Sequence, residues 1–105
     1  MSRSVRVNFA VRSAAIMENV LTELGHTFSQ VKDGVYSVAG GRYDIKMNCG
    51  EKGTIQFDSE DTGMVNGIKQ AYSLAYYRDQ AIREGMKCQE TTQANGTIVL
   101  RLTHG

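Results

Sequence analysis

The sequence predicts an α+β fold in which two helices lie on one face of an antiparallel sheet, in a ferredoxin-like or related arrangement. Short stretches alternate apolar and polar residues, as half-buried strands do, and two longer stretches repeat apolar residues at the helical period. The element order strand, helix, strand, strand occurs twice, which suggests a β-α-β-β pseudo-repeat. Such a unit buries one sheet face under its helix. The 105 residues fit a single domain, 1–105, so we expect the two units to share one sheet.

The first unit is predicted from residue 2 to residue 39. Residues 2–9 alternate as a strand does. A helix should follow, with Ser13 as its N-cap and Gly25 at its end. Its apolar stripe follows the helical spacing: Ile16, Met17, Val20, Leu21 and Leu24. A hairpin of residues 27–32 and 35–39 should then turn at Asp33 and Gly34.

Residues 42–49 show the most regular alternation in the chain, and they predict a strand between the two units. Tyr43, Ile45, Met47 and Cys49 are expected on its inner face.

The second unit is predicted to begin with a strand at residues 54–58. A long helix should follow, with an acidic N-terminal end at residues 58–61 and with Gly85 closing its C-terminal end. Tyr72 is expected at the edge of its core-facing stripe, which consists of Met64, Ile68, Ala71, Leu74, Ala75 and Ile82. A last hairpin should pair residues 86–92 with 97–103 around Asn95 and Gly96.

Several short segments resemble one small protein family. They are Tyr43-Asp44-Ile45, Gln70-Ala71-Tyr72 and the residues from Ala81 through Arg83 to Gly85 and Met86. The chain resembles the uncharacterised hypothetical chloroplast open-reading-frame family of plastids and cyanobacteria, which is also a bacterial domain of unknown function. The family's pattern has a tryptophan-containing segment after Asp58, and this chain contains no tryptophan. The difference indicates a divergent or viral member of the family. The resemblance implies a fold and a lineage, and it implies no activity.

Composition and charge give no indication of a nucleic-acid-binding, membrane or secreted protein. The formal net charge of +1 gives no electrostatic reason to favour nucleic acid or an anionic membrane. No apolar run reaches the roughly 18 residues of a membrane span, and residues 1–7 lack the apolar block of a signal peptide. We therefore expect no membrane partner and a cytoplasmic location, or the plastid stroma, or a host cytoplasm if the protein is viral.

The residue types that carry catalysis are sparse and scattered. The histidines, His26 and His104, and the cysteines, Cys49 and Cys88, lack the spacing of a metal site or a thiol nucleophile with its base. Both cysteines are expected to be reduced and to pack as small apolar residues. The glycine pairs are not arranged as a phosphate-binding loop. The sequence therefore predicts no enzyme, no cofactor and no metal.

Binding of nucleic acid by the open sheet face is the less favoured alternative. An RNA-binding sheet stacks bases on aromatic side chains, and the predicted open face has none. That face is expected to carry Arg6, Asn8, Arg42, Asp44, Lys46, Asn48, Gln56, Asp58, Gln89, Thr91, Val99 and Arg101.

Protein binding is the favoured function, with an unidentified protein as the partner. Tyr76, Tyr77 and Arg83 lie on the predicted exposed flank of the long helix, and Tyr and Arg are enriched in interfaces. Arg78 falls near the apolar stripe, where it either lays its stem on the core or holds a charge for a partner. Pairing of residues 97–103 with another copy would give a homodimer.

Overall fold

The structure, a computed structural model, describes residues 3–104, with the side chains of Cys88 and His104 outside the description. The chain forms two compact units that divide between Tyr72 and Ser73. We call them the sheet unit and the helix–hairpin unit. The elements are β1 (Ser4–Asn8), α1 (Ala14–Glu23), β2 (Phe28–Lys32), β3 (Val35–Val38), β4 (Ile45–Asn48), β5 (Thr54–Asp58), the 3-10 turn η1 (Ser59–Asp61), α2 (Thr62–Arg83), β6 (Met86–Thr92) and β7 (Ile98–His104).

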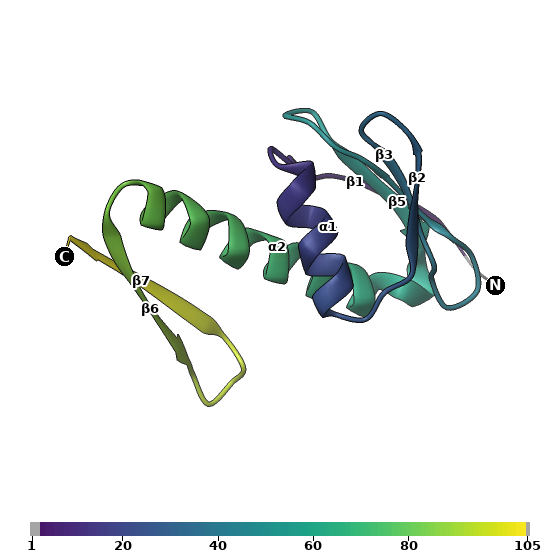
Figure 1. The fold of residues 1–105 in the computed structure, drawn as a ribbon. Coiled ribbons are helices and arrows are strands. Elements are labelled where there is room, and N and C mark those ends of the chain that lie inside the picture. Colours follow the sequence, from purple (N-terminus) through teal and green to yellow (C-terminus); the bar gives the residue numbers. More distant parts are fainter. Residues whose placement is uncertain (1–2, 105) are drawn as a thin grey trace. The chain divides into compact units, whose positions relative to one another are not determined.

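The sheet unit contains a five-stranded antiparallel sheet in the order β1-β5-β4-β3-β2. Strands β2 to β5 follow one another as a meander, and β1 closes the far edge beside β5. Helix α1 and the first part of α2 lie on the same side of this sheet (Figure 1). The α+β class and the β-α-β-β order of elements are therefore confirmed, and the ferredoxin-like arrangement stays a prediction.

The core of the sheet unit lies between these helices and the inner sheet face. Apolar side chains from the sheet and both helices have at most 5% of their surface exposed; they include Met17, Leu21, Val38, Ile45, Met47, Ile55, Phe57, Val65 and Ile68. Alternation predicted the inner positions of β4 and β5, because successive side chains of a strand point to opposite faces.

Helix α1 begins as predicted. The Ser13 hydroxyl oxygen accepts a hydrogen bond from the Ile16 amide at 3.2 Å, which satisfies an N–H group that the helix leaves without a carbonyl partner. On its buried face, Glu18 accepts a hydrogen bond from the Tyr36 hydroxyl of β3 at 2.7 Å, so the helix is joined to the middle of the sheet.

Tyr72, which was expected at the edge of the core-facing stripe of α2, is buried. It is only 3% exposed, and its hydroxyl oxygen accepts the amide hydrogens of Arg12 and Ser13 at 2.9 and 3.1 Å. Its ring also meets the Phe9 ring edge to face, 5.7 Å between centroids. We placed Tyr72 at the edge because its hydroxyl group was expected to need water. In the structure the backbone amides before α1 provide its hydrogen bonds, so the whole side chain can be buried.

The helix–hairpin unit differs from the prediction in two respects. Strands β6 and β7 form a two-stranded sheet of their own, so the expectation of one shared sheet was wrong. Ile82, assigned to the core-facing stripe, is 64% exposed. It belongs to the unit whose sheet has two strands, and so small a sheet covers less apolar surface than the five-stranded one does.

Candidate functional site

The predicted contact residues lie in the helix–hairpin unit, on the second part of α2. Tyr77 is 55% exposed, whereas Tyr76 is half-buried. Their rings meet edge to face with 5.9 Å between centroids, so each restricts the other's orientation. The two tyrosines therefore form one aromatic pair on the surface of α2, with one ring exposed and the other half-buried.

The two arginines are held by ion pairs. Arg78 contacts Glu90 of β6 at 2.7 Å, so it links α2 to the hairpin, which neither expectation for this residue included. Arg83 contacts Asp79 one turn earlier, also at 2.7 Å, and 72% of its side chain remains exposed. Because both pairs are open to water, each contributes little to stability.

The hairpin has one apolar face that is incompletely covered. The register pairs Glu90 with Leu100 and Thr92 with Ile98, so these side chains point to the same side of the two-stranded sheet. This side carries Glu90 and Thr92 together with four apolar residues, Met86, Ile98, Leu100 and Leu102, which we call the apolar hairpin face. Leu102 is 41% exposed, and no described side chain of β6 or β7 is fully buried.

The open face of the five-stranded sheet is polar. The register aligns five side chains in one row across it: Arg6, Gln56, Lys46, Ser37 and Ser29. Asp58 lies on this face as predicted, although it is only 6% exposed. One correction follows for the predicted open face: the positions on β6 and β7 belong to the separate hairpin sheet, and they are Gln89, Thr91, Val99 and Arg101.

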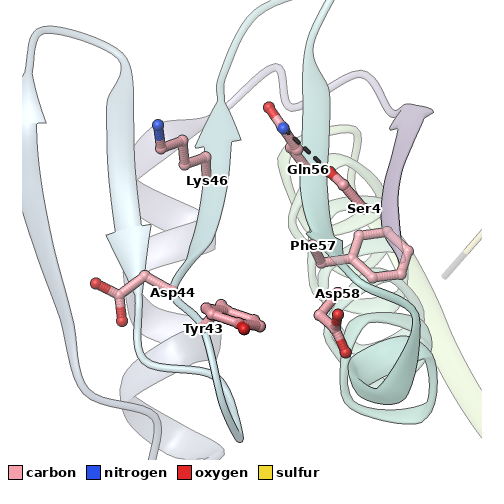
Figure 2. A pocket seen from close by; sticks show the side chains of 7 residues that line it. All are labelled: Ser4, Tyr43, Asp44, Lys46, Gln56, Phe57 and Asp58. Carbon is pink, nitrogen blue, oxygen red and sulfur yellow. Dashed lines mark hydrogen bonds between the residues drawn. The ribbon is translucent and has the colours of Figure 1, made fainter. Parts of the chain in front are cut away.

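A hollow of about 350 Å³ opens where β4 and β5 part. Their pairing ends at Lys46 and Gln56, while β5 continues beside β1 as far as Asp58. Figure 2 shows the Tyr43 ring and the Asp58 carboxyl group on opposite sides of the gap. The complete lining is Ser4, Tyr43, Asp44, Lys46, Gln56, Phe57 and Asp58.

The loop that carries Tyr43 is fixed by a buried aspartate. Asp61 is 8% exposed, and its Oδ1 accepts the Gly41 amide hydrogen at 3.0 Å. Its Oδ2 is buried, has no hydrogen-bond partner within residues 3–104, and lies against Gly40, where a Cβ atom would come within 2.7 Å of it. Sequence reasoning assigned the acidic run to helix capping alone. The adjacent glycines were the available signal that a backbone packs closely here.

Tyr43 itself was predicted on the inner face of its strand, and this prediction was wrong. Strand β4 begins only at Ile45, so the alternation does not extend to Tyr43, whose side chain is 55% exposed. The exposed Tyr43 ring forms part of the wall of the hollow.

The thiol and phenol groups near α1 are poorly suited to act as nucleophiles. Burial, followed by the negative charge of Glu18, raises the pKa of the half-buried Cys49 thiol. The hydrogen bond to Glu18, followed by burial, raises the pKa of Tyr36 to about 12. The corresponding expectation for Cys88 falls on a side chain outside the description.

Tyr36→Phe should make stability less sensitive to alkaline pH. Below pH 10 the hydrogen bond to Glu18 is intact, and we expect its loss to cost about 1–2 kcal/mol. Because the folded state holds the Tyr36 proton up to about pH 12, against 10.0 for an ordinary tyrosine, the wild type loses this contribution between these values. Urea unfolding at pH 8 and at pH 11.5 should show the difference between the two proteins shrinking. A difference independent of pH would contradict it.

Two features are absent from residues 3–104, apart from the side chains of Cys88 and His104, which the structure does not describe. No three His, Cys, Asp or Glu side chains lie close enough together to hold a metal ion. None of the helices in this range is long and apolar enough to cross a membrane.

Comparison of the chain with protein-family models, curated proteins and solved structures found no match. Membership of the chloroplast open-reading-frame family stays a prediction.

Proposed function

We propose that this protein is a small non-catalytic module that binds another protein through its helix–hairpin unit. The observation that carries the proposal is the incompletely covered apolar hairpin face. A two-stranded sheet needs further packing to be stable, and apolar surface left open on a folded domain marks an interaction site. Of the large apolar side chains found exposed within residues 3–104, four belong to this unit: Leu102 on the apolar hairpin face, Val99 on the other side of the hairpin, and Tyr77 and Ile82 on α2.

The charges around this surface suit a protein partner. Each positive charge here is paired with a negative one, Arg78 with Glu90 and Arg83 with Asp79, so these residues create no extended positive field for phosphates. Tyr77 adds an exposed ring of a type enriched at binding hot spots. Cytoplasmic action, or action in the plastid stroma or a host cytoplasm, is part of this proposal and rests on the sequence.

Leu102→Ser should weaken capture of the partner without unfolding the protein. The side chain is 41% exposed, and at a hot spot its loss should reduce retention by about 10-fold or more. Leu24→Ser, which changes a leucine that is 45% exposed at the end of α1, is the matched control and should retain the partner. Tagged proteins would be used to capture partners from a nuclease-treated extract of the source cells. Equal retention by the two variants would contradict the proposed surface.

A second copy of the chain is the alternative occupant of this surface. Each strand of the β6–β7 sheet has a neighbouring strand on one side only in the described chain, so the β7 edge is open to pairing with another β7. Sedimentation of the purified protein would then show a dimer that Leu102→Ser dissociates. Loss of all capture on nuclease treatment would instead favour nucleic-acid binding by the open sheet face.

A further inference from the structure

We propose that the hollow between Tyr43 and Asp58 binds a guanidinium group. This site lies entirely in the sheet unit, on the open sheet face, and it is independent of the proposed protein-binding surface. Its volume of about 350 Å³ accommodates a small head group with a few carbon atoms of its stem.

The carboxyl group of Asp58 provides the charge. Its Oδ2 accepts the Glu60 amide hydrogen at 3.0 Å, and Oδ1 makes no hydrogen bond within residues 3–104. The residue is 6% exposed and its Oδ1 keeps contact with solvent, so a cation in the hollow can reach this oxygen and offset the partial burial of the carboxylate.

The Tyr43 ring provides the opposite wall. It lies on the other side of the gap from the Asp58 carboxyl group (Figure 2). A cation between an aromatic face and a carboxylate gains from both contacts, and a planar guanidinium can stack on the ring while it donates to the carboxylate. An ammonium group is more strongly hydrated and lacks the planar shape. The pairing of ring and buried carboxylate therefore favours guanidinium over ammonium.

The loop keeps these walls apart. The Gly41 amide is bonded to Asp61 Oδ1, and the approach of Gly40 to the same carboxylate leaves no space for a side chain. Tyr43 is thus carried on a backbone segment that is anchored beside η1, the turn for which Asp58 is the N-cap. The two walls are positioned by one connected set of contacts before a ligand arrives.

The other charged lining residues define the controls. The Asp44 carboxyl group points away from the gap (Figure 2), and its Oδ2 accepts from the Ser37 hydroxyl at 3.3 Å. Asp44→Asn thus changes charge by the same amount as Asp58→Asn, outside the gap. Lys46 lies further along the hollow, so its ammonium group should repel a cationic ligand and attract an anionic one.

The test is titration of the full chain with n-butylguanidinium, followed by amide NMR shifts of residues 40–61. Tyr43→Ala and Asp58→Asn should each weaken binding by about 10-fold, because each removes one of the two cation contacts. Asparagine caps a helix as well as aspartate does, so Asp58→Asn should keep the fold, and Tyr43→Ala alters an exposed side chain. Asp44→Asn should change affinity by less than about 2-fold, and Lys46→Met should tighten it by about 2-fold.

Two further ligands complete the experiment. n-Butylammonium should bind more weakly than n-butylguanidinium. The guanidinium group could belong to an arginine of a protein or to a free small molecule, and acetyl-Gly-Arg-Gly-amide distinguishes these two sources. Binding of this peptide at least as tight as that of n-butylguanidinium indicates an arginine of a protein. Exclusion of the peptide indicates a free small molecule. The absence of saturable shifts would overturn the proposal. It would also be overturned if a single-stranded oligonucleotide shifted the same amides and Lys46→Met abolished that binding.

Discussion

Gly53→Ala is expected to destabilise the sheet unit by about 3 kcal/mol or more, because the new methyl group has no space and its neighbours cannot move. A Cβ atom at Gly53 would lie 2.5 Å from the Phe9 carbonyl oxygen and 2.6 Å from that of Asn48. Both are backbone atoms. The Gly53 carbonyl oxygen also accepts the Phe9 amide hydrogen at 2.9 Å, so its position ties the end of β1 to the loop before β5.

The same substitution at Gly67 is the control. Gly67 lies within α2, and no atom from outside its own helical turn lies within 4 Å of the place that a methyl group would take. Gly67→Ala should therefore stabilise the protein by about 0.5–1 kcal/mol through the higher helix propensity of alanine. Urea unfolding measures both variants. A loss below about 1 kcal/mol for Gly53→Ala would contradict the close packing described for this loop.

Tyr72→Phe is expected to cost about 2–3 kcal/mol although it removes a single oxygen atom. That oxygen accepts the amide hydrogens of Arg12 and Ser13, and the second of these residues is the N-cap of α1. Phenylalanine keeps the ring contact with Phe9 and leaves both partly buried N–H groups without their acceptor. The cost is therefore that of unsatisfied donors and includes little cavity formation.

Tyr77→Phe makes the same chemical change at a side chain that is 55% exposed, and it should alter stability by less than about 0.5 kcal/mol. Thermal unfolding of the two variants side by side tests the assignment. Equal and small effects would mean that the Tyr72 hydroxyl does not hold the segment before α1.

Local signals in the sequence predicted most of the elements. Ser13 caps α1 as expected, the Asp33–Gly34 turn joins β2 to β3, and β5 has the predicted bounds of residues 54 to 58. Each of these features depends on residues close together in the chain, where capping, turn geometry and alternation act directly.

Features that depend on distant pairing could not be predicted. Alternation placed Asp58 on the open face, but it could not show that the residue would be only 6% exposed or that a hollow would form where the β4 pairing ends at Lys46. Likewise, the hairpin pattern predicted β6 and β7 without showing that they would form a separate sheet. The exposed Tyr77 was found from the sequence, since the helical period places it opposite the core.

The proposed protein-binding role is tested most directly by photo-crosslinking from single positions in nuclease-treated extract. A benzoylphenylalanine in place of Tyr77 should form a crosslink to one protein, or to a second copy, because this exposed side chain lies in the helix–hairpin unit. The same group in place of Leu24, which is 45% exposed in the sheet unit, should form none to that partner. Equal crosslinking from both positions, or none from Tyr77, would contradict the account.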